Sequence, residues 1–130
     1  MNKNAGVWID HKEAIIVFAA TGADPTEETK KVESDLEKNS RYSGRAASEG
    51  VAEDQRDRQY AVHLDQYYDE VITQLHEAAS ILIFGPGEAK GEFKKRLEHK
   101  RMGERIVGVE TTDKMTDNQI AAKVRERYKK

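Results

Sequence analysis

The stretch Ile81-Leu82-Ile83-Phe84-Gly85-Pro86-Gly87 decides the fold. Its four consecutive apolar residues predict a short buried strand. Glycine and proline together then end that strand and form a tight corner. Because helical spacing begins directly afterwards, we expect an interior strand that leads into a helix, which is the building unit of an α/β domain.

The chain that follows this corner alternates helix, strand and helix. Ala89, Phe93 and Leu97 recur at four-residue spacing and predict the apolar line of a helix, with Gly103 marking its exit. The run from Ile106 to Val109 predicts another buried strand. In the last helix we expect a capping box and an apolar face, formed respectively by Thr116 and Gln119 and by Ile120, Ala121, Val124 and Tyr128.

Upstream of the corner, helical spacing begins near Tyr60. Acidic residues such as Asp65 and Asp69 fall mainly on one side of this helix. Apolar residues recur every three or four positions and predict one buried stripe. Its members are Leu64, Tyr67 or Tyr68, Val71, Leu75 and Ala78.

The N-terminal part predicts three antiparallel strands. Residues 5–9 alternate in the manner of a strand, and residues 14–19 form an unbroken apolar run of the kind that is covered on both faces. The polar break between them is short, so the two strands should form a hairpin. Residues 28–33 form a weaker, polar strand that suits a sheet edge, where charge discourages aggregation.

The element order is therefore β-β-β-α-β-α-β-α, which matches a ribonuclease H-like fold. We expect a single α/β domain over residues 1–130, with a five-stranded mixed sheet and helices on both faces. Residues 35–59 are polar and lack a core-forming pattern, so they are expected to form a long mobile loop.

Composition narrows the function classes. The 130 residues include no cysteine, which excludes disulfides, thiolate metal sites and cysteine nucleophiles. No apolar run approaches the roughly 20 residues that a membrane span needs, and the N-terminus lacks a secretory pattern. We therefore expect a cytoplasmic protein with no membrane partner.

The formal net charge of −2 hides a gradient along the chain. Residues 1–85 carry 9 Lys or Arg against 16 Asp or Glu, whereas residues 86–130 carry 13 against 8. One interpretation is a solvated, salt-bridged surface. The other is a basic face for an acidic partner such as RNA. The basic residues of the helix after the corner and its surroundings are Lys90, Lys94, Lys95, Arg96, Lys100, Arg101 and Arg105.

The corner itself is a candidate anion site. Gly85 and Gly87 allow a close backbone approach, and the free N–H groups at a helix start can hold an anion. The segment lacks the ending of a Walker phosphate-binding loop, and Glu88 already supplies a negative charge there. The alternative interpretation is a tight turn with a self-capped helix.

No complete catalytic set is visible in the sequence. Asp10 follows the first strand, where a ribonuclease H-like fold can hold a metal ligand, but Phe84 and Gly85 stand where a second acid is needed. The four histidines are scattered, and no serine occupies a nucleophile elbow. We therefore expect no enzymatic activity, no cofactor and no metal.

Two segments resemble a known family. Gly6-Val7-Trp8-Ile9-Asp10 followed by Ala14-Ile15-Ile16-Val17 resembles the opening hairpin of the middle domain of archaeal and eukaryotic peptide-chain release factors and of Pelota. Residues 81–93 resemble that domain's strand, Gly-Pro-Gly corner and helix, including Lys90 and Phe93. In its element order the whole chain is similar to the short bacterial relatives of this domain.

This resemblance implies a ribonuclease H-like fold of the translational-machinery type and a ribosome or RNA partner. Release factors carry a Gly-Gly-Gln loop that promotes peptidyl-tRNA hydrolysis. The matching region here, residues 38–45, has one glycine and no Gly-Gly-Gln. We therefore expect a non-catalytic RNA- or ribosome-associated domain. The residues expected to contact phosphates are Arg41, Arg45, Gly85, Gly87, Lys90, Lys94, Lys95 and Arg101.

Two alternatives stay open at this stage. One is a protein-interaction module without RNA binding, whose charge asymmetry drives self-association into a homo-oligomer. The other is a hydrolase that uses Asp10 and the Gly85–Gly87 turn.

Overall fold

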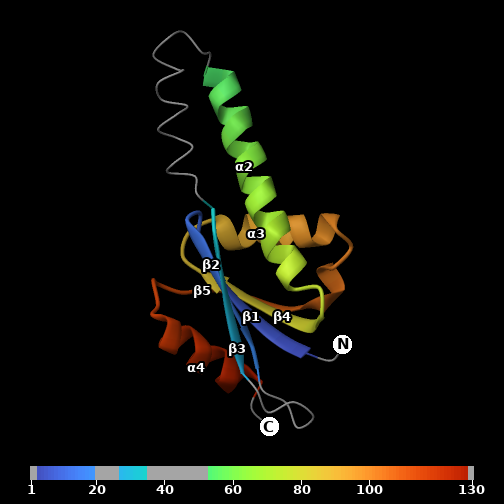
Figure 1. Cartoon of the computed structure of the whole chain (residues 1–130), viewed down its shortest axis with the longest axis vertical. Helices are drawn as coiled ribbons and strands as arrows, with labels where there is room; N and C mark the ends of the chain where they lie inside the picture. Colours follow the sequence, from blue (N-terminus) through green and yellow to red (C-terminus); the bar gives the residue numbers. More distant parts are fainter. Residues whose placement is uncertain (1–2, 20–26, 35–52, 129–130) are drawn as a thin grey trace.

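The computed structural model describes residues 3–19, 27–34 and 53–128. Their order of strands and helices is the predicted one (Figure 1). None of the helices in these ranges is long and apolar enough to cross a membrane. The elements are β1 (Lys3–Ile9), β2 (Glu13–Phe18), β3 (Glu28–Glu33), α2 (Glu53–Gln74), β4 (Ala78–Gly85), α3 (Ala89–His99), the short 3-10 helix η1 (Gly103–Arg105), β5 (Ile106–Thr111) and α4 (Asp117–Arg127).

The five strands form one mixed sheet in the order β3-β2-β1-β4-β5. β1 pairs antiparallel with β2, and β2 pairs antiparallel with β3. β4 runs parallel to both β1 and β5. The prediction of a five-stranded mixed sheet is confirmed, and β4 is an interior strand that ends at the Gly-Pro-Gly corner, as expected.

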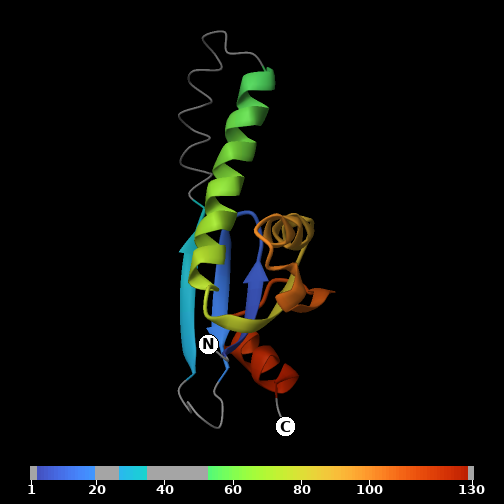
Figure 2. The ribbon, with the colours of Figure 1, turned by 90° about the vertical axis from the view of Figure 1, so that its right-hand side faces the viewer.

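The sheet separates two hydrophobic cores, because successive side chains of a strand point to opposite faces. On one face, Val7 and Ile9 of β1 and Ile83 of β4 pack with α2 and α3. On the other face, Trp8 and Phe84 pack with α4. Helices therefore cover both faces, as predicted (Figure 2).

Two glycines of the central strands are required by close contacts. A Cβ at Gly6 would lie 2.3 Å from Cγ2 of Val124, so the missing side chain lets α4 approach the sheet. Gly85 has a φ of +153°, and a Cβ there would lie 2.3 Å from the carbonyl oxygen of Ile9. The end of β4 thus packs directly against the backbone of β1.

The last helix, α4, has stabilising hydrogen bonds at both of its ends. The predicted capping box is confirmed: Oγ1 of Thr116 accepts from the Gln119 N–H, and the Gln119 side chain accepts from the Thr116 N–H. At the other end, the Tyr128 hydroxyl donates to the Ala5 carbonyl over 2.9 Å, and burial raises the pKa of Tyr128 to about 12. The capping box stabilises the first turn of α4, and the Tyr128 hydrogen bond ties the helix directly to β1.

The start of α2 differs from the prediction. The helix begins at Glu53, seven residues before Tyr60, so the expected loop over 35–59 is helical from residue 53 onward. Residues 53–59 are Glu, Asp, Gln and Arg only, and most of these favour helix without giving an apolar period. The remainder of that loop, residues 35–52, lies outside the described ranges. Figures 1 and 2 show that the N-terminal part of α2 extends beyond the sheet.

Two other expectations about local structure are wrong. The run from Ile106 to Val109 is not a buried strand: β5 lies at the sheet edge, and Val107 and Val109 are 40% and 38% exposed. Ala78 belongs to β4 and not to the stripe of α2, since that helix ends at Gln74. In both places the apolar residues indicate chain that is at least partly buried. They do not indicate which helix or strand that chain belongs to, or which elements lie beside it.

We predict that Gly6→Ala destabilises the fold by about 1–3 kcal/mol, because the added methyl group overpacks against Val124. Chemical denaturation measures this change, and the cost should shrink in a Val124→Ala background. Gly91→Ala is the matched control, because it lies in α3 with nothing within 4 Å of the new Cβ. The control should be stabilising by up to about 1 kcal/mol. An equal effect of Gly6→Ala in the presence and absence of the Val124 side chain would contradict this contact.

Candidate functional site

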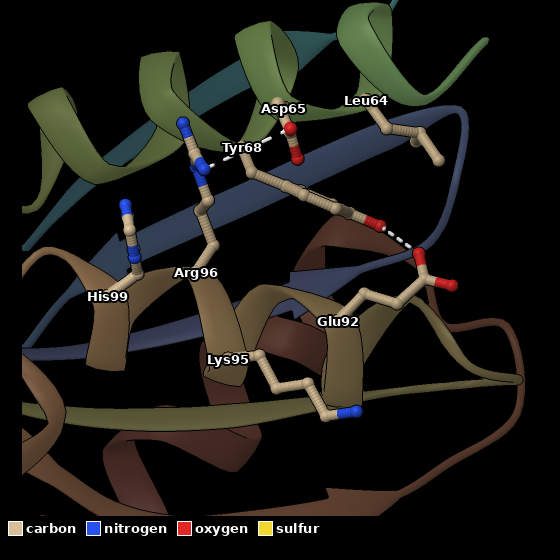
Figure 3. A pocket seen from close by; sticks show the side chains of 7 residues that line it. All are labelled: Leu64, Asp65, Tyr68, Glu92, Lys95, Arg96 and His99. Atoms are coloured by element: carbon tan, nitrogen blue, oxygen red, sulfur yellow. Dashed lines mark hydrogen bonds and ion pairs between the residues drawn. The ribbon is translucent and has the colours of Figure 1, made fainter. Parts of the chain in front are cut away.

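A groove of about 440 Å³ lies between α2 and α3. Figure 3 shows side chains from the two helices facing each other across it. Apolar parts of Leu64 and Tyr68 line it together with charged groups of both signs. The full lining consists of Leu64, Asp65 and Tyr68 from α2 and of Glu92, Lys95, Arg96 and His99 from α3.

Glu92 connects three segments at one end of the groove. Its Oε1 accepts a hydrogen bond from the Tyr68 hydroxyl over 2.7 Å and lies 3.0 Å from Nε2 of His11, in the turn between β1 and β2. The neighbouring Tyr67 donates to the Asp10 carbonyl of the same turn over 3.0 Å. Burial, followed by the charge of Asp10, raises the pKa of Tyr67 well above its usual range. Tyr67 therefore ties α2 directly to the first hairpin, and Tyr68 does so through Glu92 of α3.

The guanidinium of Arg96 binds acidic side chains of α2. Its Nε and Nη2 donate to the two carboxylate oxygens of Asp69 over 2.7 and 2.9 Å, and its Nη1 lies 3.9 Å from Asp65. Lys100 lies 3.7 Å from the same Asp69 carboxylate. The hydrogen bond from Arg96 holds the pKa of Asp69 below its usual value. Arg96 and Lys100 thus stabilise the contact between α2 and α3.

Three other cations of this region are differently placed. Lys94, Lys95 and Arg101 are exposed, and none of them has an ion-pair partner within residues 3–19, 27–34 and 53–128. Their charges are not neutralised locally, in contrast to that of Arg96. They are three of the eight residues expected to contact phosphates.

The unpaired lysines lie on two sides of α3. Successive helical residues are rotated by about 100°, so Lys94 and Lys95 point in different directions. Lys95 lines the groove, whereas Lys94 lies one turn after Lys90 on the side away from it. The ammonium of Lys90 donates to the Gly87 carbonyl and so closes the corner that precedes the helix. The predicted cations therefore flank α3 instead of forming one row.

Arg101 has an unusual backbone conformation. It directly follows the end of α3 and has a φ of 63°, the one positive φ of a non-glycine residue in the described part of the chain. The hydrogen bond from the Met102 N–H to the Leu97 carbonyl closes the helix end around it. Glycine usually occupies such a position. The expectation that Gly103 marks the helix exit is wrong, because Gly103 begins η1.

The two candidate glycines differ in exposure. Gly85 is buried, and its carbonyl accepts from the Thr112 N–H over 3.0 Å. Gly87 is exposed with a φ of 66°. Arg41 and Arg45 lie outside the described residues.

Asp10 is used in a local turn. Its Oδ1 accepts from the N–H groups of Lys12 and Glu13, both over 2.8 Å. Within the described ranges no three His, Asp or Glu side chains converge into a group that could hold a metal ion. The two hydrogen bonds within the turn therefore account for the position of the Asp10 carboxylate.

Sequence-level searches match this chain to no protein-family model and to no curated protein. Among solved structures, it is similar to the Pelota protein of Thermoplasma acidophilum, with a TM-score of 0.58 and 18% identity over 96% of the chain. Pelota of Archaeoglobus fulgidus gives 0.58 and 13% over 97%, and the archaeal translation termination factor aRF1 gives 0.50 and 16% over 98%.

These likenesses concern a part of the larger proteins. The chain spans 32%, 31% and 40% of the three structures, respectively. At such identities the comparison establishes the fold, and it confirms the resemblance that the first hairpin and the Gly-Pro-Gly corner predicted.

We predict that Asp69→Asn lowers stability at pH 7 by about 0.5–1 kcal/mol, a value discounted for solvent screening because the Arg96 and Asp69 side chains are 24% and 35% exposed. Because Arg96 lowers the pKa of Asp69 in the folded protein, this contribution is present above the ordinary Asp pKa of about 3.9. It disappears as the pH falls through the lower, folded-state pKa.

Urea unfolding of both proteins over a pH series measures the difference, which should vanish at the acidic end. Glu98→Gln serves as the control, since Glu98 is an exposed acid of α3 without an ion pair in the described region. A difference between wild type and Asp69→Asn that does not change with pH would contradict the role given to this pair.

Proposed function

We propose that this chain is a non-catalytic domain that binds RNA on the ribosome through the exposed cations of α3 and of the turn that follows it. The observation that carries the proposal is that Lys94, Lys95 and Arg101 are exposed and lack acidic partners among the described residues. Cations that already bind carboxylates are poor ligands for phosphate. Unpaired cations can neutralise phosphates and so release the counterions condensed on the nucleic acid.

The fold supports the same proposal by analogy. One of the similar structures is named a translation termination factor, and the likeness spans nearly the whole of this chain. The release-factor family acts through a Gly-Gly-Gln loop, and this sequence contains no Gly-Gly-Gln. The proposal therefore keeps the ribosome as the partner and leaves out the hydrolysis of peptidyl-tRNA.

The backbone of Arg101 adds a second line of support. A side chain held at positive φ costs of order 1 kcal/mol relative to glycine, and Arg101 makes no ion pair that offsets this cost in the described region. Strained residues concentrate at functional sites. An arginine at this position is accounted for if its guanidinium contacts a phosphate.

The first test is co-sedimentation with purified ribosomes over a salt series. We predict that Lys94→Glu/Lys95→Glu weakens binding at least tenfold at low salt. The slope of log affinity against log salt should also become smaller by about 2, or about 1 for each phosphate that the variant no longer neutralises. Lys31→Glu/Lys114→Glu is the control, because it changes the net charge equally at exposed lysines that lie in β3 and between β5 and α4. Equal weakening in the two variants would contradict the proposed face.

The second test separates binding from folding. We predict that Arg101→Gly raises the free energy of unfolding by about 0.5–1 kcal/mol, since glycine relieves the positive φ. The same variant should bind ribosomes more weakly, with a slope smaller by about 1. Denaturant unfolding and co-sedimentation measure the two effects. A more stable variant with unchanged binding would remove Arg101 from the interface.

A further inference from the structure

The two edges of the sheet are built differently. β3 carries Glu28, Lys30, Lys31 and Glu33, and charges of this kind discourage an edge from pairing with another strand. β5 begins instead with the apolar run Ile106-Val107-Gly108-Val109. Val107 and Val109 are two of the three large apolar side chains exposed in the described part of the chain. The β5 edge therefore lacks the protection that the β3 edge has.

The outer edge of β5 has unused backbone hydrogen-bonding groups. β4 pairs with its inner edge, and the register shifts at Val107, after which Gly108–Thr111 runs regularly beside β4. On the outer side, Nη2 of Arg127 lies 3.5 Å from the Val107 carbonyl oxygen. That distance is beyond the usual length of an N–H···O hydrogen bond. Among the described residues, Gly108–Thr111 is thus open to pairing with another strand.

Charge along this edge selects the partner. Nη2 of Arg127 lies beside Val107 near the N-terminal end of β5, and Glu110, whose carboxylate also binds Lys123 over 2.8 Å, lies toward the C-terminal end of the strand. An edge that is positive at one end and negative at the other is complementary to itself in an antiparallel arrangement, where unlike ends meet.

We propose that two copies of this chain associate by pairing β5 with β5 antiparallel, about a two-fold axis at Val109. In this register Val109 packs against Val109 of the second copy, and Gly108 lies opposite Glu110. Val107, beside which Arg127 lies, comes opposite Thr111 of the second copy and next to its Glu110. A two-fold axis requires that the same patch serve both partners, and the apolar centre with unlike charged ends meets that requirement.

The dimer should be weak, because only Gly108–Thr111 forms a regular ladder beyond the shift at Val107. A contact of this size buries less surface than a standard stable interface. The weight-average mass from sedimentation equilibrium of nuclease-treated protein should therefore approach twice the monomer mass only as the concentration rises from low micromolar to near millimolar. A monomer throughout this range would overturn the proposal.

Val109→Lys is the disrupting variant, since an edge lysine opposes its own copy at the axis. It should remain monomeric at every concentration. Val62→Lys is the matched control, because Val62 is also an exposed valine, 53% exposed on α2, and this variant should dimerise like the wild type. A dimer that survives Val109→Lys, or that is weakened equally in Val62→Lys, would exclude β5 as the interface.

A cross-linking experiment decides the question independently of the lysine variant. The chain has no cysteine, so Val109→Cys introduces a single thiol. Directly opposed residues of antiparallel strands have Cα atoms about 4.5–5.5 Å apart, which is within disulfide range. Mild oxidation should link Val109→Cys into a covalent dimer and leave Val62→Cys largely unlinked. Equal linking of the two variants would indicate random collision and overturn the proposal.

Discussion

The enclosure of β1 on all sides is the constraint on which the rest of the structure depends. β1 is hydrogen-bonded to β2 on one side and to β4 on the other, and both of its faces are covered by helices. A shift of one residue in its register would exchange its two faces, which would place Trp8 under α2 and bring Val7 under α4. The missing side chains at Gly6 and Gly85 allow the close approach of α4 and of the end of β4. The position of the corner, and with it the start of α3, follows from this strand.

Sequence pattern predicted the elements that this enclosure determines. The alternation of Ala5 to Ile9 and the apolar run of β4 identified the centre of the sheet, because residues covered on both faces leave a strong apolar signal. The same signal failed where the apolar or polar character of a segment does not match its secondary structure or its burial. The start of α2 is polar and helical, and β5 is apolar and half-exposed. Neither departure could be found from periodicity alone.

The groove between α2 and α3 was harder to predict from the sequence than the strands. Its organising contact brings His11 and Tyr68 to Glu92, which lies 81 and 24 positions away from them in the chain. No local motif marks such a contact. The basic character of α3 was visible in the sequence, but which of its cations lack acidic partners was not. That distinction depends on Asp65 and Asp69 of α2, which occupy Arg96 and Lys100 and leave Lys94, Lys95 and Arg101 unpaired within the described ranges.

The proposed dimer and the proposed RNA-binding face have a geometric relation. A two-fold axis that joins two β5 edges into one continuous sheet runs perpendicular to that sheet, so each face of the combined sheet has the same helices from both copies. α3 of each copy would then lie on the same side, since α2 and α3 cover one face and α4 covers the other. Two sets of unpaired cations on one side can bind one RNA surface together, which raises apparent affinity without any new contact. A weak dimer is sufficient for this effect, because binding at neighbouring sites on the RNA would itself hold the two copies together.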